Sequence, residues 1–226
     1  MANNNLIGSI SESYFNSDSL RSIDFSNNAL SGEISSKISK ETKLTNINFA
    51  SNNLNGTLPR QIRKIAGLAV LNVESNAFSG KLPASLFGLP LIDLAIGGNS
   101  FEGTIPADLP NVSTLTSLSL GPNLFTGDIP TSLNELTNLV RLSMMGIPDL
   151  GGRLPASYGL SLTDLVELSI SETSVGGDIP DQFSLMTSLK TLRLSSNSLR
   201  GKIPSSLGLL TNLGKNLQSH WQLFDT

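Results

Sequence analysis

The chain repeats itself, with a leucine-based unit that returns about every 24 residues. Aligned on the recurring leucine, the sequence divides into eight blocks, which begin at Leu20, Leu44, Leu68, Leu91, Leu115, Leu139, Leu165 and Leu189. A partial block precedes them, with its own Asn4 and Gly8. Self-similarity at such a short period is the signature of stacked repeats. Chains of this kind build one long surface, which favours binding over chemistry.

Each block predicts a strand, a turn and a short helical return. In the last block Leu192 and Leu194 alternate with polar residues, which is typical of a strand with one buried face. Leu207 and Leu210 then lie three residues apart, a spacing that suits a short turn of helix. Because no block can bury its apolar stripe alone, neighbouring blocks must stack.

An asparagine returns in most blocks, at Asn4, Asn28, Asn52, Asn76, Asn99, Asn123 and Asn197. A buried amide must be satisfied, and asparagine carries two donors and one acceptor. We therefore expect a ladder in which each asparagine bridges the backbone of its own turn and that of the next repeat.

Three further positions recur. Glycines that permit a positive φ or a close backbone approach stand at Gly8, Gly32, Gly56, Gly80, Gly103, Gly127, Gly152, Gly177 and Gly201. Prolines, which need a place where no backbone donor is required, stand at Pro59, Pro83, Pro106, Pro130, Pro155, Pro180 and Pro204. The apolar residues expected on the convex side are Tyr14, Ile38, Ile62, Leu86, Leu109, Leu133, Tyr158, Phe183 and Leu207.

The pattern L-x-x-L-x-L-x-x-N-x-L-x-G-x-I-P resembles the plant-type leucine-rich repeat, and residues 115–130 and 189–204 follow it almost letter for letter. The resemblance covers residues 1 to about 213 and implies an α/β repeat fold. This fold is a right-handed solenoid with a parallel β-sheet on its concave face, short 3₁₀ or helical segments on its convex face, and a short second sheet. The expected domains are a solenoid of one partial and eight full blocks, residues 1–213, and a non-repeat tail, residues 214–226.

The composition limits which classes of partner the chain is expected to bind. Charged residues make up 15% of the chain and the net charge is −3, which argues against nucleic acid or an anionic membrane, since both reward clustered Lys and Arg. No apolar run reaches the ~18 residues of a membrane helix.

The paired cysteines that usually flank secreted repeats of this type are missing, because the chain has no cysteine. No signal peptide is recognisable. We interpret the chain as a fragment of a longer protein at the cell surface or outside the cell.

In the tail, Trp221 and Phe224 either cap the last coil or have no structural meaning. The same tail holds the only histidine, His220, which leaves little basis for a catalytic triad. The absence of cysteine excludes the usual N/S zinc sites. Glu74 and Asp93 are expected at opposite ends of neighbouring exposed strands, which fits a solvated charge pair better than a glycosidase pair. The sequence therefore predicts a protein without enzymatic activity, cofactor or metal.

Strand residues that point away from the core should form the concave face. They are mostly small and hydrogen-bonding, and none is aromatic. The candidate partner-binding residues are Asp24, Asn48, Asn72, Glu74, Asp93, Arg141, Met145, Glu167, Glu172 and Arg193. Five of these are acids and two are arginines, which favours a mildly basic protein or peptide partner.

The blocks that begin at Leu139 and Leu165 depart from the pattern. Ile147 and Thr173 stand where the ladder asparagine is due. The 26-residue interval needs two extra residues, one near Pro148 and one near Ser161. The break, with Met145 exposed beside it, is either a contact site or tolerated drift in one repeat.

Two sequons, at Asn55 and Asn111, fall outside the main strands, where an N-glycan could be tolerated in a secreted parent.

The leading interpretation is a recognition module that resembles the ligand-binding arrays of plant-type receptor-like proteins and receptor kinases. One alternative is a soluble enzyme inhibitor resembling polygalacturonase-inhibiting proteins. A second is an ice-binding or surface-adsorbing solenoid, which needs a flat, regular row of like residues, typically threonine. Thr191 is the only threonine in the concave columns.

Overall fold

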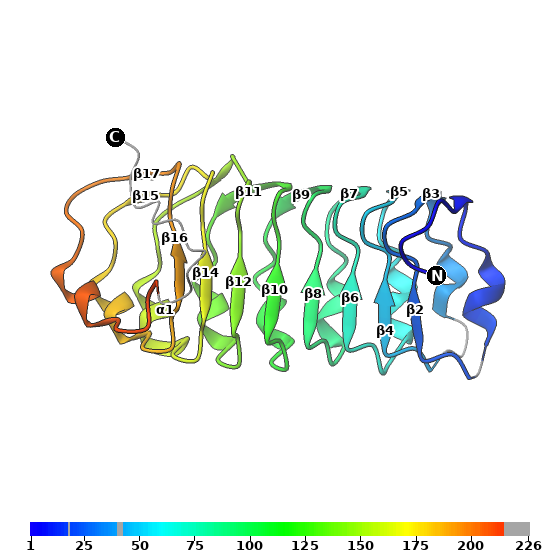
Figure 1. Ribbon diagram of the computed structural model, residues 1–226, viewed down its shortest axis with the longest axis horizontal. Coiled ribbons are helices and arrows are strands. Elements are labelled where there is room, and N and C mark those ends of the chain that lie inside the picture. Colours follow the sequence, from blue (N-terminus) through cyan, green and yellow to red (C-terminus); the bar gives the residue numbers. More distant parts are fainter. Residues whose placement is uncertain (18, 40–42, 215–226) are drawn as a thin grey trace.

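The computed structural model describes residues 1–17, 19–39 and 43–214. The described chain winds as a solenoid of stacked coils, with the first coils at one end of the long axis and the coils of β16 and β17 at the other (Figure 1). The expectation of a repeat solenoid with stacked parallel strands is confirmed. Most of the tail, with the cap predicted for Trp221 and Phe224, lies outside the described residues.

One parallel sheet of eight strands lines the concave face. Each strand is three residues long, and its central residue is buried in β2 to β14 and partly buried in β16, between two residues on the other face, as the alternating pattern predicts. The strands are β2 (Ser22–Asp24), β4 (Asn46–Asn48), β6 (Val70–Asn72), β8 (Asp93–Ala95), β10 (Ser117–Ser119), β12 (Arg141–Ser143), β14 (Glu167–Ser169) and β16 (Thr191–Arg193). They pair in sequence order and without slippage, so equivalent residues of successive blocks stand side by side.

A second parallel sheet runs along the side of the solenoid, from the stretch that follows the asparagine. Its seven strands are β1 (Ile7–Gly8), β3 (Ala29–Glu33), β5 (Asn53–Gly56), β7 (Ala77–Gly80), β9 (Ser100–Thr104), β11 (Leu124–Asp128) and β13 (Leu150–Gly151). A separate pair, β15 (Gly176–Gly177) and β17 (Ser198–Leu199), continues the row. Between the two, isolated bridges join Ile147 to Thr173 and Arg153 to Gly176.

Short helices form the convex side. Eight are 3₁₀ segments: η1 (Glu12–Asn16), η2 (Ser36–Ser39), η3 (Arg60–Lys64), η4 (Ala84–Gly88), η5 (Leu109–Asn111), η6 (Thr131–Glu135), η7 (Asp181–Leu185) and η8 (Ser205–Leu209). One is an α-helix, α1 (Ala156–Ser161). The recurring proline precedes the helix, and its carbonyl accepts the first helical hydrogen bond, as Pro59 does from Ile62. No donor is needed there, so the loss of the N–H costs nothing.

The asparagine ladder is present, with one correction to its direction. Each amide bonds to its own turn and to the preceding repeat, not the next one. The Oδ1 of Asn52 accepts from the backbone N–H of Leu30 at 3.0 Å, and its Nδ2 donates to the carbonyls of Phe25 and Phe49 at 2.9 and 3.1 Å. Because each side chain reaches back one coil, the ladder fixes the register of successive repeats.

The core runs the full length of the solenoid and includes two rows of stacked phenylalanines that the sequence analysis did not single out. Phe25 stacks on Phe49 and Phe78 on Phe101, with ring centroids 5.9 and 6.3 Å apart. The convex apolar column is buried as expected except at its first member. Tyr14 is 38% exposed and Phe15 fills the core beside it.

The 26-residue block absorbs its extra residues where expected. The first is taken up in a turn in which the N–H of Leu150 donates to the carbonyl of Ile147 at 3.0 Å. The second widens the convex segment from a 3₁₀ turn to α1, where the N–H of Leu162 donates to the carbonyl of Tyr158, four residues back.

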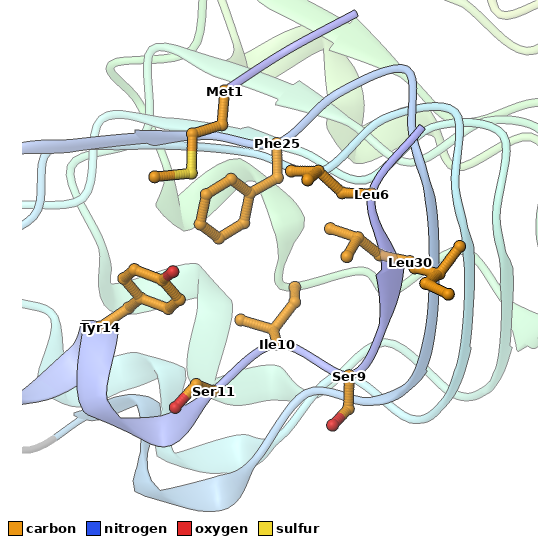
Figure 2. A pocket seen from close by; sticks show the side chains of 9 residues that line it. Met1, Leu6, Ser9, Ile10, Ser11, Tyr14, Phe25 and Leu30 are labelled. Atoms are coloured by element: carbon orange, nitrogen blue, oxygen red, sulfur yellow. The ribbon is translucent and has the colours of Figure 1, made fainter. Parts of the chain in front are cut away.

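The N-terminal end of the core has a hollow of about 200 Å³. Figure 2 shows its lining, with the side chains of Met1, Leu6, Ile10, Tyr14 and Phe25 arranged around it. The lining is mostly apolar, since these residues belong to the same columns that are buried in later coils.

Within the described ranges, no helix has the length and apolar character needed to cross a membrane.

Candidate functional site

The register of the concave sheet places the predicted partner-binding residues on one face. Asp24, Asn48 and Asn72 stand in one column, and Asp93, Arg141 and Glu167 stand in the column beside it. Glu74, Met145 and Glu172 follow the ends of β6, β12 and β14, and Arg193 closes β16. The sheet therefore brings the ten residues onto a single surface of eight strands.

At the N-terminal part of this surface, three side chains are occupied by the turn that follows each strand. The carboxylate of Asp24 accepts from the backbone N–H and the hydroxyl of Ser26, at 3.0 and 2.7 Å. These bonds hold the pKa of Asp24 below its usual value. The Oδ1 atoms of Asn48 and Asn72 accept in the same way from the N–H two residues on, at 3.2 and 3.0 Å. Such side chains shape the edge of the surface and have fewer free acceptors for a partner.

The centre of the surface has a floor of small residues. Ala95, Gly97 and Gly121 are buried although they face outward. A methyl group added at Gly97 would lie 2.2 Å from the carbonyl oxygen of Gly121, so the neighbouring backbones come too close for any side chain.

Glu74 makes use of this low floor. Its carboxylate lies beside Gly97, and the hydroxyl of Ser119, two strands away, donates to its Oε1 at 2.6 Å. The bond fixes a half-buried acceptor in the middle of the concave face. Sequence reasoning singled out Glu74 but missed its partner. The signal available was the run of residues without long side chains between the two, at Ala95 and Gly97.

The C-terminal part of the surface carries the cations. Arg141 lies 3.8 Å from the carboxylate of Glu167 on the adjacent strand, with both side chains largely in solvent. Arg193 leans back over β14, and its Nη1 donates to the hydroxyl of Ser169 at 3.4 Å. Met145 is 38% exposed. Glu172 has a positive φ of 56° in the turn after β14, which directs its backbone away from the strand path.

The break in the ladder has a local substitute. The N–H of Thr173 donates to the Oδ1 of Asn197 at 3.1 Å, and the Thr173 hydroxyl contacts the same oxygen. Ile147 is fully buried and has no polar side-chain atom to bridge its coil. The break therefore lies in the core, two residues after the exposed Met145.

Glu74 and Asp93 do not form a catalytic pair. Asp93 stands beside Val70 at the start of β8, while Glu74 stands beside Gly97 beyond the other end of that strand. In the part of the chain that the structure describes, no three His, Cys, Asp or Glu side chains are grouped in a way that could hold a metal ion.

The two sequons lie on other faces. Asn55 is exposed in β5 of the second sheet, and Thr57 beside it is exposed as well. Asn111 is exposed at the end of η5, on the convex side. Neither asparagine belongs to the buried ladder.

The family model described as Leucine Rich Repeat matches residues 19–40 and 188–210. No curated protein matches the chain in sequence.

Among solved structures, the chain is similar to the ectodomain of the plant membrane receptor kinase GASSHO1/SCHENGEN3 from Arabidopsis thaliana, in complex with Casparian strip integrity factor 2. The identity is 34% over 92% of this chain and 25% of that one, with a TM-score of 0.85. It is also similar to the plant peptide hormone receptor RGFR1 in complex with RGF2, at 30% identity over 94% of this chain and 38% of that one, with a TM-score of 0.87. A plant ice-binding protein shares the fold alone, at 22% identity over 91% of this chain and 74% of that one, with a TM-score of 0.72.

The chain thus spans between a quarter and two fifths of the length of these two receptors. The match of the repeat model, the recurring asparagine, glycine and proline, and the stacked parallel strands agree with one another. The chain belongs to the leucine-rich-repeat proteins, in their plant-type class.

Proposed function

We propose that this chain is the recognition part of a longer receptor-like protein and binds a peptide or protein on its concave sheet, without catalysis. The observation that carries the proposal is the uninterrupted register of eight parallel strands, which presents outward-facing polar residues as one surface. The likeness to two receptor ectodomains, each in complex with its ligand, supports it.

The ligand chemistry follows from the charged and apolar groups that the concave surface presents. Because Asp24, Asn48 and Asn72 bond to their own turns, the central and C-terminal residues are better placed to contact a partner. Glu74 and Asp93 would meet basic groups over the small-residue floor. Met145 offers an adaptable apolar contact at the edge of that floor.

A displayed library of random dodecapeptides tests the proposal. We expect selected peptides to lose affinity by about tenfold or more when Ser119→Arg and Ser143→Arg are introduced together, because two long side chains then stand on the sheet. The matched control is Thr104→Arg with Thr126→Arg, which adds the same charge to exposed positions of the second sheet. A library that yields no binder, or binders that both variants weaken equally, would contradict concave recognition.

Two other functions, ice binding and enzyme inhibition, can be tested on the same purified protein. Thermal hysteresis would indicate an ice-binding solenoid, for which the plant ice-binding protein offers a likeness of fold alone. Inhibition of a polygalacturonase would indicate an enzyme inhibitor. We expect neither, since the concave columns present no regular row of like residues.

An extracellular location follows from the receptor proposal, and with it N-glycans at Asn55 and Asn111. Both side chains are exposed and lie away from the concave sheet, so glycans would leave that surface bare. Expression through a eukaryotic secretory pathway should give two glycan mass increments by intact mass spectrometry. Thr57→Val and Ser113→Ala should each remove one of them. A protein that is secreted with no increment would contradict the glycan assignment and leave concave binding open to its own test.

A further inference from the structure

Charge is segregated along the chain in a way that the overall composition hides. Six of the 15 Lys and Arg residues lie between residues 37 and 64, a stretch with one acid, Glu41. Residues 82–140 contain no Lys or Arg and five acids: Asp93, Glu102, Asp108, Asp128 and Glu135. A net charge of −3 therefore conceals a strongly basic segment followed by a strongly acidic one.

The fold gathers part of the basic segment on two adjacent convex helices. In η3, Ile62 is buried, and Arg60, Arg63 and Lys64 are all exposed. The neighbouring η2 adds Lys37, which is exposed and 2.7 Å from the carboxylate of Glu12. We call Lys37, Arg60, Arg63 and Lys64 the basic patch. Since one acid neutralises one of its four cations, three remain without an ion-pair partner among the described residues.

A groove of about 500 Å³ adjoins the basic patch, where the second sheet meets the convex helices. Two cations line it, Arg60 and Lys81, together with the hydroxyl of Ser36 and the amide of Gln61. Glu33 also lines the groove, and its side chain lies against Gly56, where an added methyl group would come within 2.7 Å of it. The groove thus offers cations and hydrogen-bonding groups side by side.

The acids that follow on the same side limit what could bind. Asp108 and Glu135 are exposed at η5 and η6, two and three coils beyond η3. Adjacent coils are about 4.8 Å apart, so a long polyanion of uniform charge running along the solenoid would soon meet them. Duplex DNA, an anionic membrane or an acidic polysaccharide would be repelled there. A polypeptide can carry its acids over the basic patch and other residues elsewhere.

We propose that the basic patch and its groove dock a short acidic segment of a partner protein. The site is separate from the concave sheet and does not depend on what that sheet binds. Its cations would form ion pairs with carboxylates, while Ser36 and Gln61 would bond to the segment's backbone.

Fluorescence anisotropy with labelled hexaglutamate tests the proposal. An extended peptide of this length spans about 20 Å and can lie on the patch alone. We expect binding at about 50 mM salt that weakens strongly at about 500 mM, because exposed charges are screened. Arg60→Glu, Arg63→Glu and Lys64→Glu together should reduce the affinity by about tenfold or more.

The matched control is Lys190→Glu, Arg200→Glu and Lys202→Glu, three exposed cations in the last coils. It makes the same change in net charge and should leave hexaglutamate binding within about twofold. The milder Arg60→Gln, Arg63→Gln and Lys64→Gln set repeats the test if charge reversal impairs folding. Equal losses in the patch and control variants would overturn the proposal. So would tighter binding of duplex DNA, phosphatidylserine vesicles or polygalacturonate than of hexaglutamate.

Discussion

At the scale of single residues, the recurring asparagine amide satisfies backbone groups that would otherwise be buried without partners. Asn123 is 3% exposed. Its Oδ1 accepts from the N–H of Phe101 at 2.9 Å, and its Nδ2 donates to the carbonyl of Ile96 at 3.0 Å, both in the preceding repeat. Water has no access to replace these bonds, so the side chain is part of the backbone hydrogen-bond network.

Replacing Asn123 with alanine should therefore destabilise the chain by about 1–3 kcal/mol, the usual cost of orphaned buried polar groups. Asn138→Ala is the control. That side chain also bonds to the preceding repeat, at the carbonyl of Ser113, but it is exposed and water can take its place. We expect its effect to stay within about 0.5 kcal/mol. Urea melts give the free energy of unfolding of both variants. Similar losses in the two would show that the burial of Asn123 does not increase its contribution to stability.

A second residue-scale prediction concerns Gly97. An alanine there would place its methyl group 2.2 Å from the carbonyl oxygen of Gly121, and a backbone atom in a sheet cannot move aside cheaply. We expect the free energy of unfolding to fall by about 1–3 kcal/mol or more, as is usual for overpacking. Gly88→Ala, with no heavy atom within 4 Å of the new methyl group, should be neutral or slightly stabilising. Thermal melts that show no difference between the two variants would contradict the close approach of the strands.

Residue-scale features that depend on the repeat could be predicted from the sequence, and features that depend on exceptions to it could not. The positions of Asp93 and Arg141 follow from register alone, because every block repeats the same path. The bond between Glu74 and Ser119 spans two repeats and depends on a missing side chain at Gly97. No local pattern encodes it. The backward direction of the asparagine bonds also escaped, because the sequence gives the period but not which neighbour the amide faces.

At the scale of elements, the convex segments show how one extra residue changes a helix. In η6, the N–H of Leu136 donates to the carbonyl of Leu133, three residues back. In α1 the equivalent bond, from Leu162 to Tyr158, spans four residues. The hydroxyl of Tyr158 also donates to the carbonyl of Pro130 at 2.8 Å, which ties α1 to the coil before it. Tyr158 and Leu162 stay buried because the additional residue, Ser161, is absorbed by the wider turn.

Deleting Ser161 should therefore be tolerated. The segment would return to a 3₁₀ turn with the spacing found in the other blocks, and we expect the midpoint of thermal unfolding to change by less than about 3 °C. Deleting Asn134 from η6 is the control. It would bring Leu133 and Leu136 within two residues of each other and remove one of them from the core, with a loss of more than about 5 °C. Equal effects would mean that α1 is not a widened 3₁₀ turn.

Elements were predictable where the period was regular. The concave strands and the convex turns follow from the alternation and spacing within one block, and the second sheet was expected from the resemblance to the plant-type repeat. The basic patch was not foreseen, because Lys37 and Arg60 are 23 residues apart in the sequence and become neighbours only when η2 and η3 pack together. In a repeat protein, charged residues that are distant in the sequence can be neighbours on adjacent coils. Charge clusters therefore have to be sought across the repeats as well as along the sequence.

At the scale of the whole molecule, stability in a stacked array is close to a sum of repeat terms and nearest-neighbour terms. The concave sheet runs unbroken through all eight blocks, but the other two connections weaken at one place. The ladder side chain is replaced by Ile147 and then by Thr173, and the second sheet is reduced to two isolated bridges, Ile147 to Thr173 and Arg153 to Gly176. The molecule therefore has a weak coupling around its sixth and seventh blocks, which the sequence indicated through its 26-residue interval.

This coupling should be visible in amide hydrogen exchange. We expect the N–H of Phe125 to exchange faster than the equivalent N–H of Phe101, because Asn123 accepts from Phe101 whereas Ile147, at the equivalent position of the next repeat, has no side-chain acceptor. The Asn123→Ala variant should bring the N–H of Phe101 toward the faster rate, while the N–H of Phe78, which donates to Asn99, should change little. Unfolding followed by peptide should then occur in more than one step. Uniform protection from residue 70 to residue 199, in the parent chain and the variant alike, would show that the concave sheet alone couples the repeats and that the ladder contributes little to cooperativity.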